Sequence, residues 1–460
     1  MDTSLEKKKE RHSFSGHLGF ILAAAGASVG LGNIWRFPYL AAKYGGGIFL
    51  IVYIILAASF GYTMIVAETV LGRRTKKSPV GAFKFFSDKK AFAIGGWINA
   101  IIPMLIVPYY STIGGWVLNY LFSYLKGDSA LVATDDYFGS FISNGFQVEG
   151  WFLVFALLTI VVILSGVKKG IERVSRIMMP ILVVLALLVC IYSVTRPGAI
   201  EGVKYFLIPN LEHFSWMTIV SAMGQMFYSL SIAMGILITF GSYMKDDVSI
   251  DKATRNVEIF DTGIAIMAGL MIIPAVFAFS GGDSSVLKAG PSLMFITIPK
   301  VFADMGHASF IGIMFFLLVF FAALTSAIAL TESAVSTFED ELGWNRKIST
   351  LVMFAIMIVL GSLSSLGYGP LANVTIFNMQ FLDFFDFLTN SIMMPLAAIA
   401  ICLYVTYAMG LDAVEDEMTK NGATFKRKKL FNFMIRFVCI IFLLVILASS
   451  ILQVLNIITI

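Results

Sequence analysis

The chain contains eleven apolar runs that are each long enough to cross a lipid bilayer, and this repetition limits the possible folds more than any other feature. A spanning helix needs about 20 mostly apolar residues, because the hydrocarbon layer is ~30 Å thick. Charged residues make up only 13% of the sequence, which excludes a soluble multidomain enzyme, a disordered chain and a disulfide scaffold. We therefore predict an all-α, polytopic membrane protein with 11 transmembrane helices. The runs cover residues 17–41, 46–72, 92–125, 150–167, 174–194, 214–243, 257–281, 305–338, 348–368, 377–407 and 431–456.

The distribution of lysine and arginine predicts how the chain is oriented. Basic residues accumulate in connections on the cytoplasmic side of a membrane. One set of alternate connections holds 26 basic residues and the opposite set holds 6. We therefore expect a multi-pass protein of the cell's inner membrane whose N-terminus lies in the cytoplasm. Eleven crossings would place the C-terminus outside. No cleavage site follows the charged start at residues 6–11, so the first run is expected to be retained as a helix.

Nothing in the sequence favours an enzyme or ATP-driven transport. No Gly-rich loop ends in the phosphate-binding GK[ST] pattern, and the four histidines are scattered near the ends of the runs. Cys190, Cys402 and Cys439 lie far apart in apolar surroundings, where we expect them to be packing residues. The net charge of +4 is too small to indicate a nucleic-acid partner. We expect no enzymatic activity and no organic cofactor.

Two of the apolar runs carry small and polar residues at mid-depth. The first contains GASVGLGNIWRFP at residues 26–38, and the sixth contains GQMFYSLSIAMG at residues 224–235. Each glycine inside a helix costs roughly 1 kcal/mol relative to alanine. Irregular backbone is tolerated inside a membrane only where it lines a protected cavity. Close packing of helices through small residues is the alternative explanation for a single run of this kind.

The positions of these two runs predict the domain organisation. They begin two successive blocks of five helices, which favours a 5+5 inverted-repeat transporter with discontinuous helices 1 and 6. We expect one transmembrane domain over residues 1–460, with a first repeat at about 17–194, a second at about 214–407 and an extra helix at about 431–456. Half-helix N-termini favour a carboxylate, and freed carbonyl oxygens favour a hard cation such as sodium.

The sequence resembles the neurotransmitter:sodium symporter family, especially its bacterial, leucine-transporter-like branch with eleven helices. The motifs that carry the resemblance run nearly from end to end, and the first of them is very specific. The resemblance implies that two sodium ions are co-transported with an amino acid by alternating access. The motifs are GASVGLGNIWRFPY at 26–39 followed by GGG at 45–47, ETVLGR at 68–73, YY at 109–110, KGIER at 169–173, GQMFYSLS at 224–231, AALTS at 322–326 and FEDEL at 338–342.

The resemblance also implies which residues form three adjoining binding sites. Oxygen-only ligation suits a hard monovalent cation. A carboxylate shared by ion and substrate would make each raise the affinity of the other. The first sodium site would use the substrate carboxylate with Ser28, Asn33, Ser229 and Asp261; the second would use Gly26, Val29, Ala322, Thr325 and Ser326; and the substrate site would use Leu31, Gly32, Ile106, Tyr110, Tyr228, Ser231, Met234, Ser326 and Leu330.

The resemblance also implies an outer gate, which would close the substrate site from the outside. Arg36 would pair across the outer vestibule with an acid on the tenth helix. Asp386 fits the spacing best, and Asp383 is the alternative. Tyr110 and Tyr228 would form an aromatic lid beneath that pair.

An inner gate is implied on the cytoplasmic side. There Arg11 would pair with Asp340, with Phe14 and Tyr243 beside them. Phe14 departs from the tryptophan that is usual in the family. Exposed ion pairs contribute only ~0–1 kcal/mol, which suits a contact that must open.

Two positions refine the expected substrate and ions. Gly30 stands where monoamine-carrying relatives have an aspartate, which leaves room for a substrate that brings its own carboxylate. Asp261 stands where many relatives have asparagine, so a built-in carboxylate would replace chloride. An ionisable group inside the membrane is expensive, which favours a function for Asp261. We predict chloride-independent transport of hydrophobic amino acids; a proton-coupled carrier on the same scaffold and an amino-acid-gated channel or receptor are the alternatives. The sequence does not indicate an oligomeric state.

Overall fold

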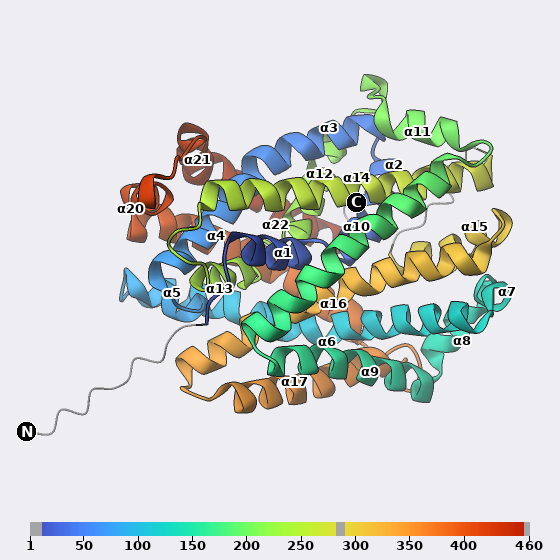
Figure 1. Ribbon diagram of the computed structural model, residues 1–460, viewed down its shortest axis with the longest axis horizontal. Coiled ribbons are helices and arrows are strands. Elements are labelled where there is room, and N and C mark those ends of the chain that lie inside the picture. Colours follow the sequence, from blue (N-terminus) through green and yellow to red (C-terminus); the bar gives the residue numbers. More distant parts are fainter. Residues whose placement is uncertain (1–11, 282–289, 455–460) are drawn as a thin grey trace, which may run out of the picture.

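Long helices make up the fold of this protein. The computed structural model describes residues 12–281 and 290–454, and Figure 1 shows the helices packed side by side along the long axis of the molecule. Within the described residues, the only strand-like pairings are two isolated bridges, Gly46 with Pro209 and Ile376 with Met379. The predicted all-α class is confirmed.

The helix boundaries follow the apolar runs closely. The first part of the chain contains α1 (His17–Ser28), η1 (Gly32–Arg36), α2 (Phe37–Lys43), α3 (Gly47–Leu56), η2 (Ala57–Gly61), α4 (Tyr62–Thr75), α5 (Pro79–Phe85), α6 (Lys90–Lys126), α7 (Ser129–Val132), α8 (Asp135–Ser143), α9 (Gly145–Leu164), η3 (Val167–Glu172) and α10 (Arg173–Val194). The second part contains α11 (Ala199–Leu207), η4 (Leu211–His213), α12 (Trp216–Ser229), α13 (Ile236–Ser242), α14 (Ile250–Ser280), η6 (Leu293–Thr297), α15 (Ile298–Asp304), α16 (Ala308–Glu341) and α17 (Arg346–Leu366). The last part contains α18 (Phe381–Asp386), η7 (Phe387–Met393), α19 (Met394–Tyr404), η8 (Val405–Met409), α20 (Leu411–Met418), η9 (Lys420–Gly422), α21 (Lys428–Phe433), η10 (Met434–Val438) and α22 (Cys439–Val454).

The described residues contain nine uninterrupted helical segments that are long and apolar enough to span a membrane. A tenth span is the bent pair of α1 with η1 and α2, whose axes differ by 54°. The expected sixth span is divided into α12, with 14 residues, and α13, with 7, and each is too short to cross alone. The count of eleven therefore stays a prediction, because the sixth crossing depends on joining two separate helices.

The breaks in the first and sixth spans occur where the sequence places its small and polar residues. α1 ends at Ser28, where Val29 turns to an extended conformation, and helical backbone resumes at Gly32. Between α12 and α13, Ser231 and Ala233 adopt positive φ angles of 53° and 60°. L-residues in this left-handed region cannot continue a right-handed helix. The predicted discontinuous helices 1 and 6 are confirmed.

These broken helices lie inside a bundle of continuous ones. α1 packs against α10, α14 and α16, while α13 packs against α4 and α16. In Figure 1, α1 lies near the centre of the bundle with the long helices α14 and α16 on either side of it. This arrangement encloses the irregular backbone in protein, as the cost of unpaired polar groups in lipid requires.

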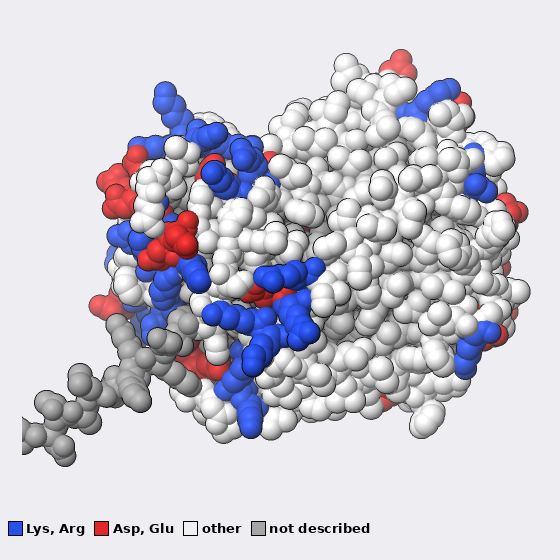
Figure 2. Space-filling view, viewed as in Figure 1, with Lys and Arg blue, Asp and Glu red and all other residues white. Residues whose placement is uncertain are grey.

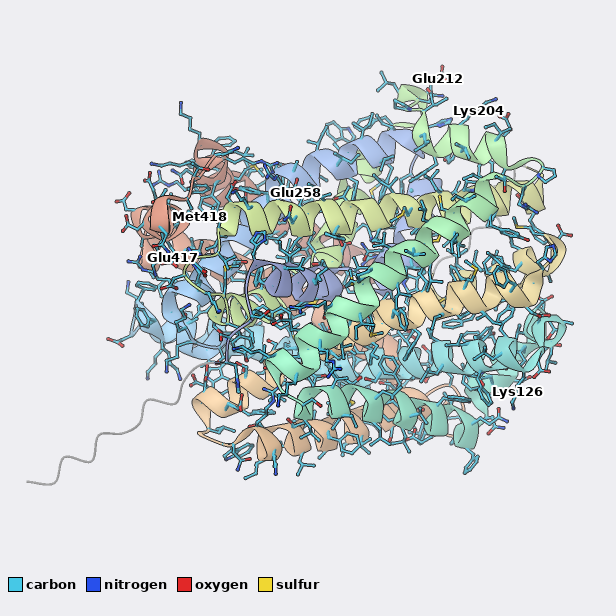
Figure 3. All side chains as sticks on the ribbon, viewed as in Figure 1. Lys126, Lys204, Glu212, Glu258, Glu417 and Met418 are labelled. Carbon is cyan, nitrogen blue, oxygen red and sulfur yellow. The ribbon has the colours of Figure 1, made fainter. Side chains whose placement is uncertain are left out.

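On the face shown in Figure 2, charged side chains gather at the two ends of the bundle and leave the surface between them uncharged. Figure 2 shows a broad white band between a densely charged end on the left and a sparsely charged end on the right. Glu417 lies at the left-hand end, whereas Lys126, Lys204 and Glu212 lie at the right-hand end (Figure 3). The uncharged band matches the hydrocarbon layer expected from the sequence.

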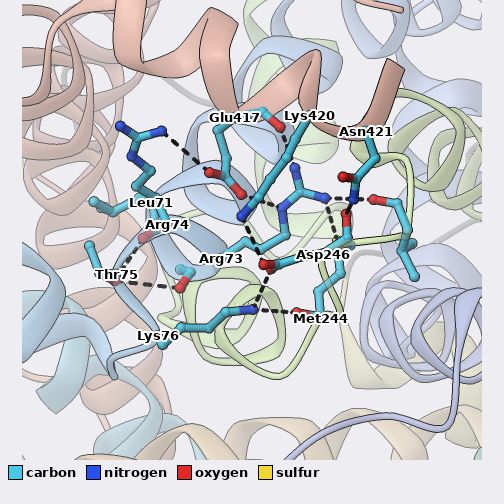
Figure 4. A network of polar contacts seen from close by, with 12 residues as sticks. Leu71, Arg73, Arg74, Thr75, Lys76, Met244, Asp246, Glu417, Lys420 and Asn421 are labelled. Atoms are coloured by element: carbon cyan, nitrogen blue, oxygen red, sulfur yellow. Dashed lines mark hydrogen bonds and ion pairs between the residues drawn. The ribbon is translucent and has the colours of Figure 1, made fainter. Parts of the chain in front are cut away.

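A polar network fastens α20 to the end of α4 (Figure 4). The Arg73 guanidinium donates from Nε to Glu417 Oε1 at 2.6 Å and from Nη1 to the Val248 carbonyl at 2.6 Å. Asp246 accepts from Lys420 at 2.8 Å and lies 3.2 Å from Lys76. The hydrogen bond from Lys420 holds the pKa of the Asp246 carboxyl below its ordinary value. The network joins the ends of α4 and α20 to the connection between α13 and α14.

Candidate functional site

The two helix breaks enclose a small cavity near the middle of the bundle. Its volume is about 30 Å³. All nine residues that the sequence assigned to the substrate lie along its wall, so residues far apart in the chain are brought together as expected. Their role in binding stays a prediction. The wall consists of Ala27, Ser28, Gly30, Leu31, Gly32, Asn33, Ile106, Tyr110, Tyr228, Ser229, Ser231, Met234, Ile236, Ser326 and Leu330.

A buried carboxylate organises the polar side of this cavity. Asp261 accepts hydrogen bonds from Asn33 Nδ2 at 2.8 Å, from the Ser229 hydroxyl at 2.8 Å and from the Tyr53 hydroxyl at 3.1 Å. Asn33 Oδ1 accepts from the Gly30 N–H at 3.1 Å, so this side chain turns its amide nitrogen toward Asp261. Three of the four residues predicted for the first sodium site therefore contact one another directly.

Ser28 and Tyr53 complete this cluster in ways that the sequence did not fully indicate. The Ser28 hydroxyl donates to the Ala24 carbonyl at 3.1 Å, within its own helix. The hydroxyl proton of Ser28 is thus engaged within α1, and Ser28 makes no side-chain contact with Asp261 among the described residues. Tyr53 was not predicted as part of the site. Its one sequence signal is a hydroxyl in the otherwise apolar stretch GIFLIVYIIL of α3.

The residues predicted for the second sodium site also lie together. The Ser326 hydroxyl lies 3.1–3.3 Å from the carbonyl oxygens of Gly26, Ala27 and Val29, which the end of α1 leaves without helical partners. The Thr325 hydroxyl donates to the Phe321 carbonyl at 2.9 Å and lies 3.2 Å from the Ala322 carbonyl. Carbonyl and hydroxyl oxygens from α1 and α16 thus face one another.

Two positions in the first break must be glycine because side chains from neighbouring helices approach the backbone closely there. A Cβ atom on Gly30 would lie 2.9 Å from Ser326 Oγ and 3.1 Å from the Tyr110 hydroxyl. A Cβ atom on Gly32 would lie 2.7 Å from the Tyr228 ring. The absence of side chains at these positions allows the backbone of the first break to border the cavity directly.

Side chains from neighbouring helices hold the two breaks in place. Gln225 Nε2 donates to the Gly32 carbonyl at 2.9 Å, and Glu68 accepts from the Ala233 N–H at 2.7 Å. The Leu31 N–H donates to the Tyr110 hydroxyl at 3.3 Å. Unpaired backbone groups are costly when they are buried, and these side chains satisfy three of them.

The outer gate has part of its expected geometry. The Arg36 guanidinium lies over the Tyr228 ring, 5.6 Å from its centroid. Arg36 interacts electrostatically with Asp386, although the two form no direct ion pair among the described residues. Asp386 instead accepts from Tyr109 at 3.1 Å and from Asn390 at 2.5 Å.

The alternative acid lies in different surroundings. Asp383 accepts from the Tyr368 hydroxyl at 3.1 Å and, unlike Asp386, does not interact electrostatically with Arg36 within the described residues. Asp386 is therefore better placed than Asp383 for the predicted outer gate.

The end of the bundle that is expected to face the cytoplasm contains a network that the sequence did not predict. Arg11, the expected partner of Asp340, lies outside the described residues. Asp340 accepts from the Ser78 N–H at 2.7 Å. The Phe14 N–H donates to the Tyr243 carbonyl at 3.2 Å, and the two rings pack edge to face.

Glu332 is the centre of this inner network. It is completely buried and accepts from the Tyr243 hydroxyl at 2.8 Å and from Arg346 Nη2 at 2.5 Å. The signal was present in the sequence, because Glu332 is a carboxylate within an apolar run, as Asp261 is. The argument used for Asp261, that a carboxylate in an apolar run is costly, would also have identified Glu332 as a candidate functional residue.

The sequence matches a known protein family over nearly its whole length. The model of the sodium:neurotransmitter symporter family matches residues 11–138 and 139–458. The chain belongs to this family. As a symporter of the family it is a sodium-dependent membrane transporter and not an enzyme.

Relatives from bacteria and from the rat share most of this symporter's length. An uncharacterized sodium-dependent transporter, YhdH of Bacillus subtilis, is 34% identical over 88% of this chain and 90% of its own. An uncharacterized sodium-dependent transporter of Haemophilus influenzae is 31% identical over 96% of this chain and 98% of its own. The rat sodium- and chloride-dependent taurine transporter is 25% identical over 89% of this chain and 73% of its own.

A solved structure resembles this symporter over nearly its whole length. The crystal structure of MhsT in complex with L-phenylalanine matches with a TM-score of 0.86 and 36% sequence identity. The match covers 96% of this chain and all of the other. The expected family and fold class are thereby confirmed.

Proposed function

We propose that this chain is a sodium-coupled symporter of hydrophobic amino acids that works by alternating access. The observation that carries the proposal is the cavity between the two helix breaks, which brings the nine predicted substrate residues beside both predicted sodium sites. The likeness to MhsT, whose structure contains L-phenylalanine, supports an amino acid as the substrate.

The walls of the cavity match the two ends of such a substrate. η1 begins at Gly32 beside the cavity, and the N-terminal end of a helix attracts a carboxylate. Ile106, Met234 and Leu330 supply an apolar wall for the side chain. The cavity volume is only about 30 Å³, so we expect the wall to move outward around a bulky side chain. Methionine repacks readily, which suits Met234 to this movement.

Two sodium ions are proposed on the basis of the two oxygen clusters. The first cluster combines Asp261, Ser229 and Asn33, and its use of the Asn33 oxygen requires that amide to turn from its position in this structure. The second combines the freed carbonyl oxygens of α1 with Thr325 and Ser326. A substrate carboxylate at the first cluster would link sodium binding to substrate binding, because each would raise the affinity of the other.

Chloride independence is proposed from Asp261. This carboxylate is completely buried and accepts hydrogen bonds from Asn33, Ser229 and Tyr53. Its negative charge offsets part of the charge of two sodium ions, so an external anion is not needed. We expect the uptake rate to stay the same when gluconate replaces chloride at constant sodium. A several-fold fall would contradict this part of the proposal.

The direction of transport follows from the expected orientation. The end of the bundle that carries Arg73 and Glu332 would face the cytoplasm, and Arg36 with Asp386 would close the site on the outer side. The inverted-repeat boundaries predicted from the sequence, at about 17–194 and 214–407, are part of this proposal.

Uptake into vesicles of purified protein tests the symporter against its alternatives. We expect radiolabelled leucine or phenylalanine to accumulate above its outside concentration under an inward sodium gradient, and to leak out when that gradient collapses. A proton-coupled carrier would instead accumulate substrate under a pH gradient without sodium. A channel would never exceed equilibrium. Undiminished uptake with potassium in place of all sodium would overturn the proposal.

A further inference from the structure

A basic pocket lies at the start of α10, well apart from the transport cavity. Its volume is about 410 Å³, and its lining includes Lys169, Glu172 and Arg173 of the KGIER motif, which the transport cavity does not use. Four of its side chains are cationic and one is a carboxylate. The pocket is lined by Lys168, Lys169, Glu172, Arg173, Arg176 and Ile177.

The one carboxylate in this pocket is already engaged. Glu172 is buried, accepts from Arg176 Nη2 at 2.6 Å, and accepts from the Ser15 N–H at 2.8 Å. Glu172 therefore neutralises Arg176 and anchors the segment that leads into α1. It has no capacity left to neutralise the other three cations of the pocket.

Those three cations have no carboxylate partner among the residues that the structure describes. Lys168, Lys169 and Arg173 are exposed, whereas two other arginines, Arg73 and Arg346, are paired with carboxylates. Arg73 binds Glu417 at 2.6 Å and Arg346 binds Glu332 at 2.5 Å. The pocket thus concentrates unbalanced positive charge and offers a guanidinium fork, which binds phosphate oxygens in pairs.

The pocket opens onto the surface that faces lipid. Ile177, Ile181 and Val184 are 55%, 41% and 55% exposed along the same side of α10. Figure 2 shows basic side chains gathered over the left-hand end of α10, with the uncharged band directly beside them. Arg173 and Val184 are separated by ~16 Å along the helix, close to the ~15 Å thickness of one hydrocarbon leaflet.

We propose that this pocket binds the headgroup of an anionic phospholipid whose acyl chains lie along α10. The lipid phosphate would contact Lys168, Lys169 and Arg173. The pocket lies at the end of the bundle expected in the cytoplasm, and anionic lipids are concentrated in the cytoplasmic leaflet. The proposal concerns lipid binding and does not depend on the transported substrate.

Fluorescence quenching by brominated lipid tests the proposal locally. The full chain with Ile177→Trp is placed in vesicles of phosphatidylcholine and phosphatidylglycerol, with bromine on the acyl chains of one lipid at a time. The signal of the native tryptophans is subtracted using the parent chain. We expect phosphatidylglycerol to quench Trp at this position about five-fold more strongly per bromine than phosphatidylcholine does. Equal quenching by the two lipids would overturn the proposal.

Charge variants on the same background identify the cations responsible. Lys168→Gln, Lys169→Gln and Arg173→Gln together should bring the quenching ratio to about one, and Arg173→Lys should retain most of it. The matched control replaces the exposed Lys77, Lys89 and Lys90 by Gln and should leave the ratio unchanged. If the triple variant fails to insert, the Lys168→Gln/Lys169→Gln pair serves in its place and should lower the ratio at least about two-fold.

Inorganic phosphate separates a lipid site from a site for soluble anions. At constant ionic strength, added phosphate should not reduce the quenching ratio, because a headgroup attached to acyl chains in the membrane competes at high local concentration. Loss of the ratio with phosphate would overturn the lipid proposal, as would an unchanged ratio in the charge variants or an equal loss in the control.

Discussion

At the scale of single residues, Asp261 shows how the sequence and the structure complement each other. Its position inside an apolar run was enough to predict a functional carboxylate. The structure adds what the sequence could not give, because Tyr53 and Ser229 come from different helices and meet Asp261 only through packing. Gln225 lies in the GQMFYSLS motif at 224–231, but the sequence could not show its hydrogen bond to the Gly32 carbonyl, because that bond depends on the break in the first span.

Asp261→Asn keeps the shape of this side chain and removes its charge. We expect the sodium concentration for half-maximal uptake to rise about ten-fold, because a charge-assisted contact is replaced by a neutral one. We also expect chloride to stimulate uptake by the variant, since an external anion can supply the missing charge. Uptake in gluconate and in chloride at graded sodium measures both effects. Unchanged sodium dependence would show that Asp261 does not interact with a transported ion.

At the scale of elements, the break before α13 illustrates why a helix ends where it does. Gly235 has a φ of 70°, and a Cβ there would lie 2.7 Å from Ser333 Oγ and 2.9 Å from the Asn99 carbonyl. Composition alone located this break to within a few residues. It could not show which of the small residues is indispensable, because that depends on neighbours from α6 and α16.

Gly235→Ala should therefore lower the free energy of unfolding by at least about 1 kcal/mol, since both the backbone conformation and the space oppose a side chain. Thermal unfolding of the purified protein in detergent measures the change as a lower Tm. Gly224→Ala is the matched control, because Gly224 is helical in α12 and nothing lies within 4 Å of an added Cβ. The control should be neutral or slightly stabilising. Equal effects of the two substitutions would contradict the assignment.

The connection between α13 and α14 gives a second prediction at this scale. Because Lys420 lowers the pKa of Asp246 in the folded protein, their interaction stabilises the fold above the ordinary aspartate pKa of ~3.9 and is lost as the pH falls through the lower, folded value. Asp246→Asn should thus lower Tm at neutral pH and have progressively less effect below about pH 4. Asp88→Asn, also exposed at this end of the molecule, is the control for a general change in net charge. A Tm difference that grows as the pH falls would contradict the prediction.

At the scale of the whole molecule, the distribution of basic residues predicts which end faces the cytoplasm. Lys420 and Lys204 lie at opposite ends of the bundle, and the three native cysteines are buried. In intact cells, a membrane-impermeant thiol reagent should label Lys204→Cys and should label Lys420→Cys only after the membrane is opened. The reverse pattern would overturn the predicted orientation.

The all-α membrane fold could largely be predicted from the lengths of the apolar runs. The predicted number of eleven spans, however, is not confirmed by the structure. Length and hydropathy identify a helix only when it is continuous, and nine spans in the described residues satisfy that condition. The first and sixth spans are interrupted at the residues that we propose bind sodium and substrate. Apolar length predicts residues 214–243 as one crossing, but the structure divides this run into two short helices, α12 and α13.

The attachment of α20 to α4 determines which parts of the protein can move together. The side chains of Arg73 and Glu417 are only 1% and 2% exposed, and separating a buried ion pair costs about 3–5 kcal/mol. We therefore expect this pair to stay intact if, as proposed, a transport cycle opens this end of the bundle. α4, α20 and the connection after α13 would then rotate as one rigid body. Its hinge would be Gly410, where a φ of 84° already separates α20 from η8.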